Sequence, residues 1–373
     1  MADSGNVTIY GQVNASVVMA DNGDGTGAAS ASKGTSSTRI SSDQSRLGLK
    51  GSEDLGGGTS AIWQIESGIT ADAGSGTWAS RNTFVGLAGE SWGDIKLGNN
   101  DSPYKSSTRG LDLFADTVAD NRSVVGIIGQ GTSSLDARNS SSLTYTSPDL
   151  SGFKVSAQYV AAAEGATTNG TNKGSNFSAS LAYNAGPITA AAAMVQMKAG
   201  ATGTGTSAVS TAPFTVAALS TTTAATPAVD DKLRGLRLGG GYKMDAVTVN
   251  AVFERIESDI THAGGRTDLV KTNSIYVGGK FAVSGSDAVK VAYTRRGDVG
   301  EGAQKVSQSK VSQWSVGYDH AMSKRTSVYA LYTKMNNDNI SGLGLTNASS
   351  DSVSARANGA DPTAFAFGVK HSF

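Results

Sequence analysis

The 373-residue sequence contains no cysteine, only 6 prolines and no long apolar run. The missing cysteine excludes disulfides, thiol nucleophiles and cysteine-based metal sites. A transmembrane helix would need about eighteen consecutive apolar residues, so the sequence also excludes that class of membrane anchor. Lysine and arginine together balance aspartate and glutamate, 31 against 31, which argues against a nucleic-acid partner.

Glycine, in contrast, is abundant at 47 residues. Such a composition suits many short β-strands joined by turns and argues against a helix bundle. A transmembrane β-barrel is compatible with it, because each strand of such a barrel needs only one apolar face. The opening residues, MADSGNVTIYG, lack the charged and apolar parts of a signal peptide. We expect that a signal peptide was removed and that Met1 was added for expression.

Segments with alternating apolar and polar residues recur along the chain, about sixteen in all. In SRLGLKG, for example, Leu47 and Leu49 share one face, and Arg46 and Lys50 share the other. The connections between the segments are alternately short and long, as an up-and-down barrel across one membrane requires. The sequence therefore predicts an all-β fold, a 16-stranded antiparallel transmembrane β-barrel that forms a single domain over residues 1–373.

Three connections are unusually long. Gly200–Asp231 and Asn336–Asp361 are polar, and we expect them to be external loops. The third, Asp101–Asn139, is far above the usual loop length, yet it carries apolar residues and charges of both signs. We interpret it as a loop folded inward against the wall of strands. The alternative is a capping loop over a β-sandwich. An inward loop would narrow a lumen that sixteen strands make too wide for side chains to fill.

Several motifs are specific enough to compare with a known family: GSEDLGGGTSAIWQIESG, Gly51–Gly68, above all, and also VTIYGQV, SRLGLKG, SRNTFVGL and the terminal Phe. Together they resemble the Gram-negative general porins of the betaproteobacterial, neisserial-like type. The resemblance implies a homotrimer of barrels in the bacterial outer membrane, each narrowed by its third external loop. It also implies contact with outer-membrane lipid and lipopolysaccharide, and passage of small hydrophilic solutes and ions.

The same resemblance implies a constriction in which basic wall residues face acids on the inward loop. By motif, the basic wall includes Arg46, Arg81 and Arg138, and Lys50, on the same strand face as Arg46, is a further candidate. The candidate loop acids are Asp112, Asp116, Asp120 and Asp136. Strand parity supports an inward side chain at Arg46 and Arg138 but not at Arg81. Glu66 is a candidate partner for a wall arginine. Phe373, the last residue, resembles the signal read by the outer-membrane assembly machinery.

One departure from the family pattern is Asn99, at a position where family members often carry arginine. This substitution weakens the basic cluster, so we expect passive diffusion with only a mild preference for anions. The alternatives are a substrate-specific channel, an adhesin that acts through its long loops, and an outer-membrane hydrolase. His262, His320 and His371 lack a nucleophile elbow or zinc spacing, so we expect no catalytic residue, metal or cofactor.

Overall fold

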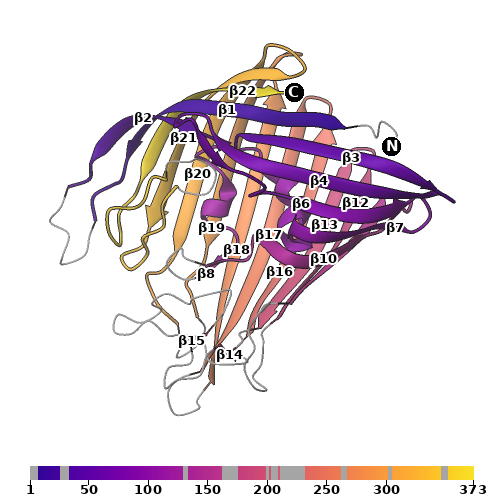
Figure 1. Cartoon of the computed structure of the whole chain (residues 1–373). Coiled ribbons are helices and arrows are strands. Elements are labelled where there is room, and N and C mark those ends of the chain that lie inside the picture. The colour runs from indigo at the N-terminus through magenta and orange to yellow at the C-terminus, as the bar shows by residue number, and fades with distance from the viewer. Residues whose placement is uncertain are drawn as a thin grey trace.

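The computed structural model describes residues 7–25, 33–128, 133–161, 175–198, 201–202, 209–210, 232–261, 267–300, 305–345 and 352–373. Most of these residues belong to one antiparallel sheet that curves into a barrel (Figure 1). In the described part of the chain, none of the helices has the length and apolar character needed to cross a membrane.

The main sheet has 18 strands. Two of them, β2 and β3, together form one strand of the wall, and β5 (Ser75–Thr77) is a short strand paired with β4. The wall is therefore a closed barrel of 16 strands. The predicted fold class is confirmed. The wall strands are β1 (Thr8–Asp21), β2 (Ser36–Ser42) with β3 (Arg46–Gly56), β4 (Thr59–Thr70), β6 (Thr83–Gly89), β7 (Gly93–Asp101), β10 (Arg138–Thr146), β11 (Phe153–Ala161), β12 (Ser175–Ala185), β13 (Ile188–Lys198), β16 (Lys232–Met244), β17 (Val247–Thr261), β18 (Thr267–Ala282), β19 (Asp287–Arg296), β20 (Val311–Ala321), β21 (Thr326–Asn337) and β22 (Thr363–Ser372).

The first and last strands close the barrel. β1 pairs with β22 from Gln12↔Ser372 to Asp21↔Thr363, and on its other side it pairs with β2 and β3. Phe373 extends the seam, since its amide donates to the Gly11 carbonyl at 3.1 Å and its carbonyl accepts from the Gly11 amide at 3.0 Å. Closure leaves no sheet edge with unpaired backbone groups, which excludes the β-sandwich alternative.

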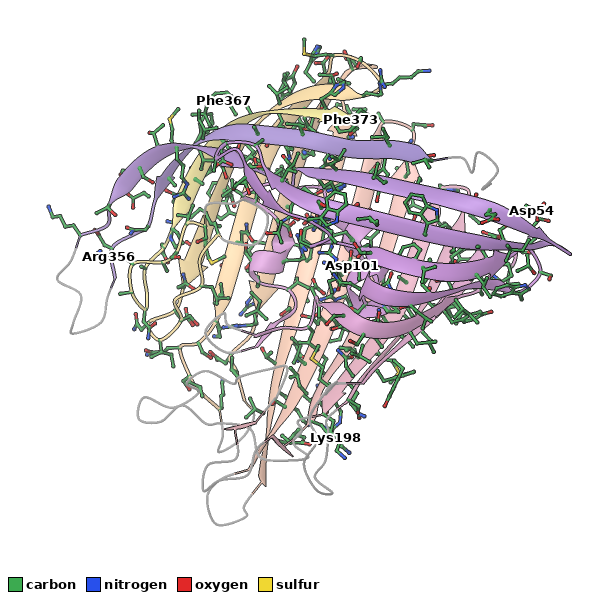
Figure 2. The ribbon with its side chains drawn as sticks, viewed as in Figure 1. Asp54, Asp101, Lys198, Arg356, Phe367 and Phe373 are labelled. Atoms are coloured by element: carbon green, nitrogen blue, oxygen red, sulfur yellow. The ribbon has the colours of Figure 1, made fainter. Side chains whose placement is uncertain are left out.

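Alternation along the strands separates an apolar outer face from an inner face, which is polar where it meets the lumen and apolar where loops pack against it. On β7, Ile95 and Leu97 are exposed on the outside, and Lys96 between them points into the lumen. On β22, Phe367 is exposed on the outside, whereas Ala366 is buried inside (Figure 2). The period of two follows directly from strand geometry, and it gives lipid and water separate faces of a single-layer wall.

The two ends of the barrel differ in their connections. The link from β3 to β4 is a tight turn in which Gly56, Gly57 and Gly58 have φ angles of 82°, 61° and 75°, a region that only glycine adopts freely. Asp54, beside this turn, lies at one end of the barrel, and Lys198 lies at the other (Figure 2). Of the predicted loop Gly200–Asp231, the structure describes only β14 (Ala201–Thr202) and β15 (Val209–Ser210), and the rest lies outside the described residues.

The segment between β7 and β10 runs along the inside of the wall (Figure 1). It contains α1 (Pro103–Ser107), the short 3₁₀ helices η1 (Arg109–Leu111) and η2 (Asn121–Ser123), and the two-residue strands β8 (Ile127–Ile128) and β9 (Ser133–Ser134). Ser102 caps α1 by accepting from the Lys105 amide, and Pro103 follows at the first helical position. We call residues 102–137 the inner loop.

The inner loop is held by apolar packing. Its Phe114, Val118, Val124 and Ile127 share a buried cluster with inward side chains of β1, β20, β21 and β22. The same cluster contains Leu343, Leu345 and Val353 of the last long connection, Asn336–Asp361, which folds back over the inner loop. The side of the barrel around the β1–β22 seam is therefore filled by two loops.

The seam leads to a prediction about Phe373. Deleting Phe373 removes two backbone hydrogen bonds and one half-exposed ring, so we expect a loss of only about 1–3 kcal/mol in unfolding free energy in detergent. Insertion in cells should fall much more, because the terminal residue resembles an assembly signal. The measurements are urea unfolding in micelles and the amount of barrel in outer-membrane fractions. Phe281→Ala removes a comparable outer ring on β18, away from the seam, and is the control. Equal losses in the two assays would show that Phe373 is structural only.

Candidate functional site

Arg46 projects into the lumen from the first residue of β3. Its Nη1 lies 3.3 Å from the Asp116 carboxylate of the inner loop and 3.2 Å from the Gln44 carbonyl. The Asp116 carboxylate also forms an ion pair with Arg109 at 2.7 Å, and the backbone carbonyl of Asp116 accepts a hydrogen bond from the Asn14 side chain at 2.9 Å. Asp116 therefore ties the inner loop to the wall at β1 and β3, beside Arg46.

Arg81 also points inward, although strand parity does not support that direction. Its Nε donates to the Glu66 carboxylate at 2.6 Å, and its Nη1 donates to the Gln44 side chain at 2.9 Å. The reason is local, because β6 begins only at Thr83 and Ala79 has a φ of 55°, so Arg81 lies outside the alternating strand. The expected pairing of Glu66 with a wall arginine is confirmed.

Arg138, the first residue of β10, completes a set of three arginines. Its Nη2 lies 3.0 Å from the Asp101 carboxylate. The same carboxylate forms an ion pair with the ammonium group of Lys105 at 2.7 Å. Its Nε donates to the Asn82 side chain at 2.8 Å. Arg81 and Arg138 line the same hollow of about 610 Å³. We call Arg46, Arg81 and Arg138 the arginine set.

Lys50 lies on the same face of β3 as Arg46 but four residues further on, which corresponds to about 13 Å along a strand. Its ammonium group lies 5.2 Å from the centre of the Tyr10 ring. Lys50 is therefore separate from the arginine set. Asn99, which replaces the family's arginine, donates its side-chain amide to the Arg81 carbonyl at 3.0 Å and so helps to position Arg81.

Two of the predicted loop acids are buried inside the inner loop. The Asp112 and Asp120 side chains are only 1% and 0% exposed. Asp112 accepts from the backbone amides of Phe114 and Asn121 at 2.9 and 3.0 Å, and burial, followed by the charge of Asp120, raises its pKa to about 7. Both carboxylates therefore hold the fold of the loop and do not face open water.

Asp120 has a different electrostatic setting, because two guanidinium groups reach its carboxylate. Arg109 lies 2.6 Å from it and Arg122 lies 3.1 Å from it. Burial raises the pKa of Asp120, but these two arginines outweigh burial and hold the pKa well below its usual range. The loop thus keeps a charged, fully paired carboxylate at its centre.

Asp136 belongs to a second anchor of the loop. Its carboxylate receives Arg237 of β16 at 2.7 Å, with side-chain exposures of 4% and 1%. Arg237 also pairs with Glu254 of β17, which accepts from the Tyr104 hydroxyl at 2.7 Å and from the Gly126 amide at 2.7 Å. We call Tyr104, Asp136, Arg237 and Glu254 the buried anchor. Burial raises the pKa of Asp136, although the Arg237 charge opposes that rise.

The sequence reasoning missed Asp101, Lys105 and three members of the buried anchor, Tyr104, Arg237 and Glu254. Asp101 ends a strand and Lys105 follows it by four residues across the cap of α1, so their spacing was the available signal. Nothing in the local sequence pointed from the loop to Arg237, because that contact joins residues more than a hundred positions apart.

The histidines are not gathered at any of these sites. His320 contacts Asp287 at 2.8 Å in a part-buried position, and His371 contacts the Thr326 hydroxyl at 2.9 Å in an exposed one. His262 lies outside the described residues. Among the residues that the structure describes, no three His, Cys, Asp or Glu side chains form a possible metal site.

The buried anchor leads to a prediction about the loop. Arg237→Met leaves Asp136 and Glu254 buried without their cation, a change that typically costs about 3–5 kcal/mol. We expect the inner loop to detach and trypsin to cleave after Lys105, Arg109 and Arg122 much faster, while the barrel remains folded. Arg234→Met is the control, since Arg234 is on the same strand and pairs with Asp259 in a half-exposed position. Equal cleavage rates in the two variants would contradict this role of the anchor.

Comparison with known proteins agrees with the geometry. A family model described as Gram-negative porin matches residues 1–340. The outer membrane porin protein 32 of Delftia acidovorans is 30% identical over 381 residues, covering 100% of this chain and 95% of that protein. The major outer membrane protein P.IB of Neisseria lactamica is 26% identical over 284 residues, covering 76% and 74%.

Among solved structures, the anion-selective porin from Comamonas acidovorans superimposes with a TM-score of 0.73 at 25% identity, covering 99% of this chain and 100% of that one. The extent of the family match and the full-length relative confirm the resemblance read from the motifs. The chain belongs to the Gram-negative porin family.

Proposed function

We propose that this outer-membrane channel passes small hydrophilic solutes and ions by diffusion without catalysing a reaction, and that the arginine set determines its ion preference. The observation that carries the proposal is the arrangement of Arg46, Arg81 and Arg138, which point into the lumen from separate segments of the wall beside the inner loop. Charged groups at the narrowest part of a pore act on permeating ions more strongly than distant ones, which salt screens.

The local charge balance supports a mild anion preference. The ion-pair networks that contain Arg46, Arg81 and Arg138 join six cations with five carboxylates, an excess of one positive charge. The members are Arg46, Arg81, Lys105, Arg109, Arg122 and Arg138, with Glu66, Asp101, Asp112, Asp116 and Asp120. The buried anchor, with one cation and two carboxylates, is a separate network that is not exposed to the water of the lumen. The similar porin from Comamonas acidovorans is described as anion-selective, which favours the same sign here.

We propose that the barrel assembles as a homotrimer through the β1–β22 seam. On the outside of the seam, an apolar hollow of about 580 Å³ is lined by Val17, Ile40, Phe367 and Val369 around Ala15 and Ala330. Small residues between large ones let a second surface approach closely. Ile9, Val13, Val17, Phe365 and Phe367 are the candidate contacts. The remaining apolar band would face outer-membrane lipid and lipopolysaccharide.

The arginine set leads to a prediction about ion selectivity. Replacing Arg46, Arg81 and Arg138 with serine leaves Asp116, Glu66 and Asp101 with fewer cations. We expect the reversal potential across a tenfold KCl gradient to change sign, from weak anion to cation preference. Asp116→Asn should shift it the opposite way, and both shifts should shrink at higher salt. Arg234→Ser, outside the lumen, is the control. An unchanged reversal potential in the triple variant would refute the assignment.

The seam leads to a prediction about assembly. The wild-type protein should migrate as an oligomer in SDS without boiling and near 37.8 kDa after boiling. Val17→Arg places a charge in the seam hollow and should give monomers. Val291→Arg places the same charge on the outer face of β19 and should leave the oligomer intact. Oligomers of equal stability in both variants would show that the subunits meet elsewhere.

A further inference from the structure

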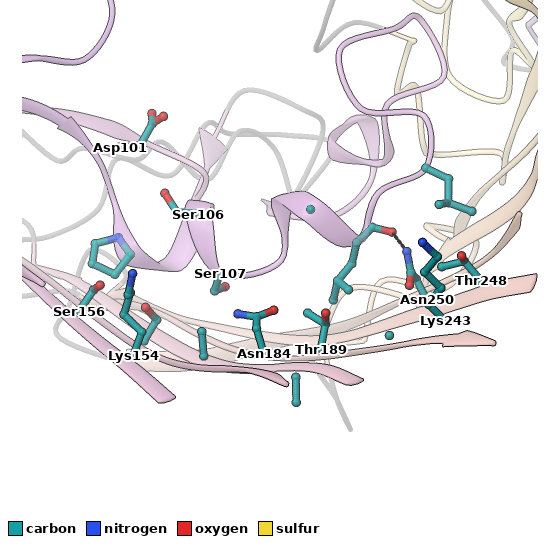
Figure 3. A pocket seen from close by; sticks show the side chains of 18 of the residues that line it. Asp101, Ser106, Ser107, Lys154, Ser156, Asn184, Thr189, Lys243, Thr248 and Asn250 are labelled. Atoms are coloured by element: carbon teal, nitrogen blue, oxygen red, sulfur yellow. Dashed lines mark hydrogen bonds between the residues drawn. The ribbon is translucent and has the colours of Figure 1, made fainter. Parts of the chain in front are cut away.

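A large hollow lies in the barrel on the tight-turn side of the inner loop. It measures about 1140 Å³, and its lining comes from strands β4 to β18, the underside of the inner loop and turns such as Asp245–Ala246 and Ser284–Gly285. Figure 3 shows the side chains of the wall facing α1 across this space. We call it the lower vestibule. Arg46, Arg81 and Arg138 are not part of its lining.

Three lysines of the lower vestibule have no carboxylate partner among the residues that the structure describes. Lys154, Lys243 and Lys280 all line the hollow, and no ion pair or hydrogen bond of their ammonium groups occurs in the described chain. The fourth lysine, Lys96, is paired with Asp94 at 2.8 Å. Lys154 and Lys243 extend from the wall toward the loop in Figure 3. These three ammonium groups are available to a ligand.

Strand register gathers two of these lysines with a third cation. Lys243 and Lys280 lie directly opposite Thr248 on its two sides, which puts their Cα atoms about 10 Å apart. Lys280 in turn lies opposite Lys290 of β19, a like-charge pair that is unfavourable across a sheet. The ammonium group of Lys290 pairs with Asp319 at 2.8 Å and donates to the Leu113 carbonyl at 3.0 Å. Lys280 therefore has a cation beside it and no carboxylate partner of its own among the described residues.

The remaining lining favours negative solutes. Its two carboxylates are Asp101, which already holds Lys105 and Arg138, and Asp245 in a turn. Neutral donors lie between the lysines on the wall and on the facing loop: Ser106, Ser107, Ser156, Asn184, Thr189 and Thr248. Hydroxyl and amide groups can donate to oxyanions without adding a competing negative charge.

We propose that the lower vestibule is a weak binding site for small multivalent oxyanions, such as di- and tricarboxylates and phosphate esters, held by Lys243 and Lys280, with Lys154 as a separate contact three strands away. A monovalent ion can use one ammonium group at a time, whereas a multivalent oxyanion can contact Lys243 and Lys280 together, because their Cα atoms are about 10 Å apart. Such a site enriches these anions inside the channel and slows their exit, so they should reduce chloride current. The proposal rests on the channel function and adds a substrate class to it.

The experiment uses single channels of the full-length protein in a planar bilayer. KCl conductance is recorded first, which tests the channel itself separately. Citrate or pyrophosphate is then added at constant ionic strength, with gluconate as the monovalent comparison, and the concentration for half-block of the current is measured. The variants are Lys154→Gln/Lys243→Gln/Lys280→Gln, the same triple change to arginine, and an external control, Lys33→Gln/Lys324→Gln/Lys334→Gln, at lysines that do not line the hollow.

We expect citrate or pyrophosphate to block the wild type at concentrations well below gluconate. The glutamine triple variant should raise the half-block concentration at least about fivefold, because each exposed charge contact that it removes weakens anion binding only modestly. The arginine triple and the external control should stay within about twofold of wild type. Equal block by gluconate, no block of the wild type, or an equal loss in the external control would each overturn the proposal.

Discussion

A sheet in lipid must satisfy every backbone donor and acceptor within itself, and the rest of this molecule depends on that constraint. The pairing of β1 with β22 meets it by closing the sheet, and Phe373 extends the seam by two more hydrogen bonds. Closure with 16 strands then creates a lumen that wall side chains cannot fill. The inner loop occupies that space, and its packing brings charged residues to the water that remains.

Charge inside the barrel serves two separate purposes. Around Glu254 and Arg237, buried charges pair with each other and hold the inner loop at β16 and β17. Arg81 and Arg138 keep their partners but still face a hollow, and Arg46 keeps its partner with 26% of its side chain exposed. A buried pair that loses one partner is costly, so the first group resists change, whereas the second can vary with solute preference.

Much of the fold was predictable because a period of two is visible in the sequence. The same period indicated the inward direction of Arg46, but it failed for Arg81, whose segment leaves the strand pattern at Ala79. Sequence reasoning also could not separate Asp116, which reaches a wall arginine, from Asp112 and Asp120, which the loop buries. Burial of a loop acid depends on tertiary contacts. Leu343 and Leu345, in a connection expected to be polar and external, pack inside for the same reason.

The two loops packed inside one side of the barrel make the wall more rigid there than on the opposite side. Around the seam, β1, β20, β21 and β22 are backed by the inner loop and the last connection, and their inner side chains form a close-packed core like that of a water-soluble domain. Strands β4, β6, β7 and β10 border an open hollow and contribute no residue to the buried apolar clusters of the described chain. Backbone amides of the strands around the seam should therefore exchange hydrogen with solvent far more slowly than those of β4, β6, β7 and β10. The barrel thus combines a rigid side around the seam with a more deformable side that borders its water-filled path.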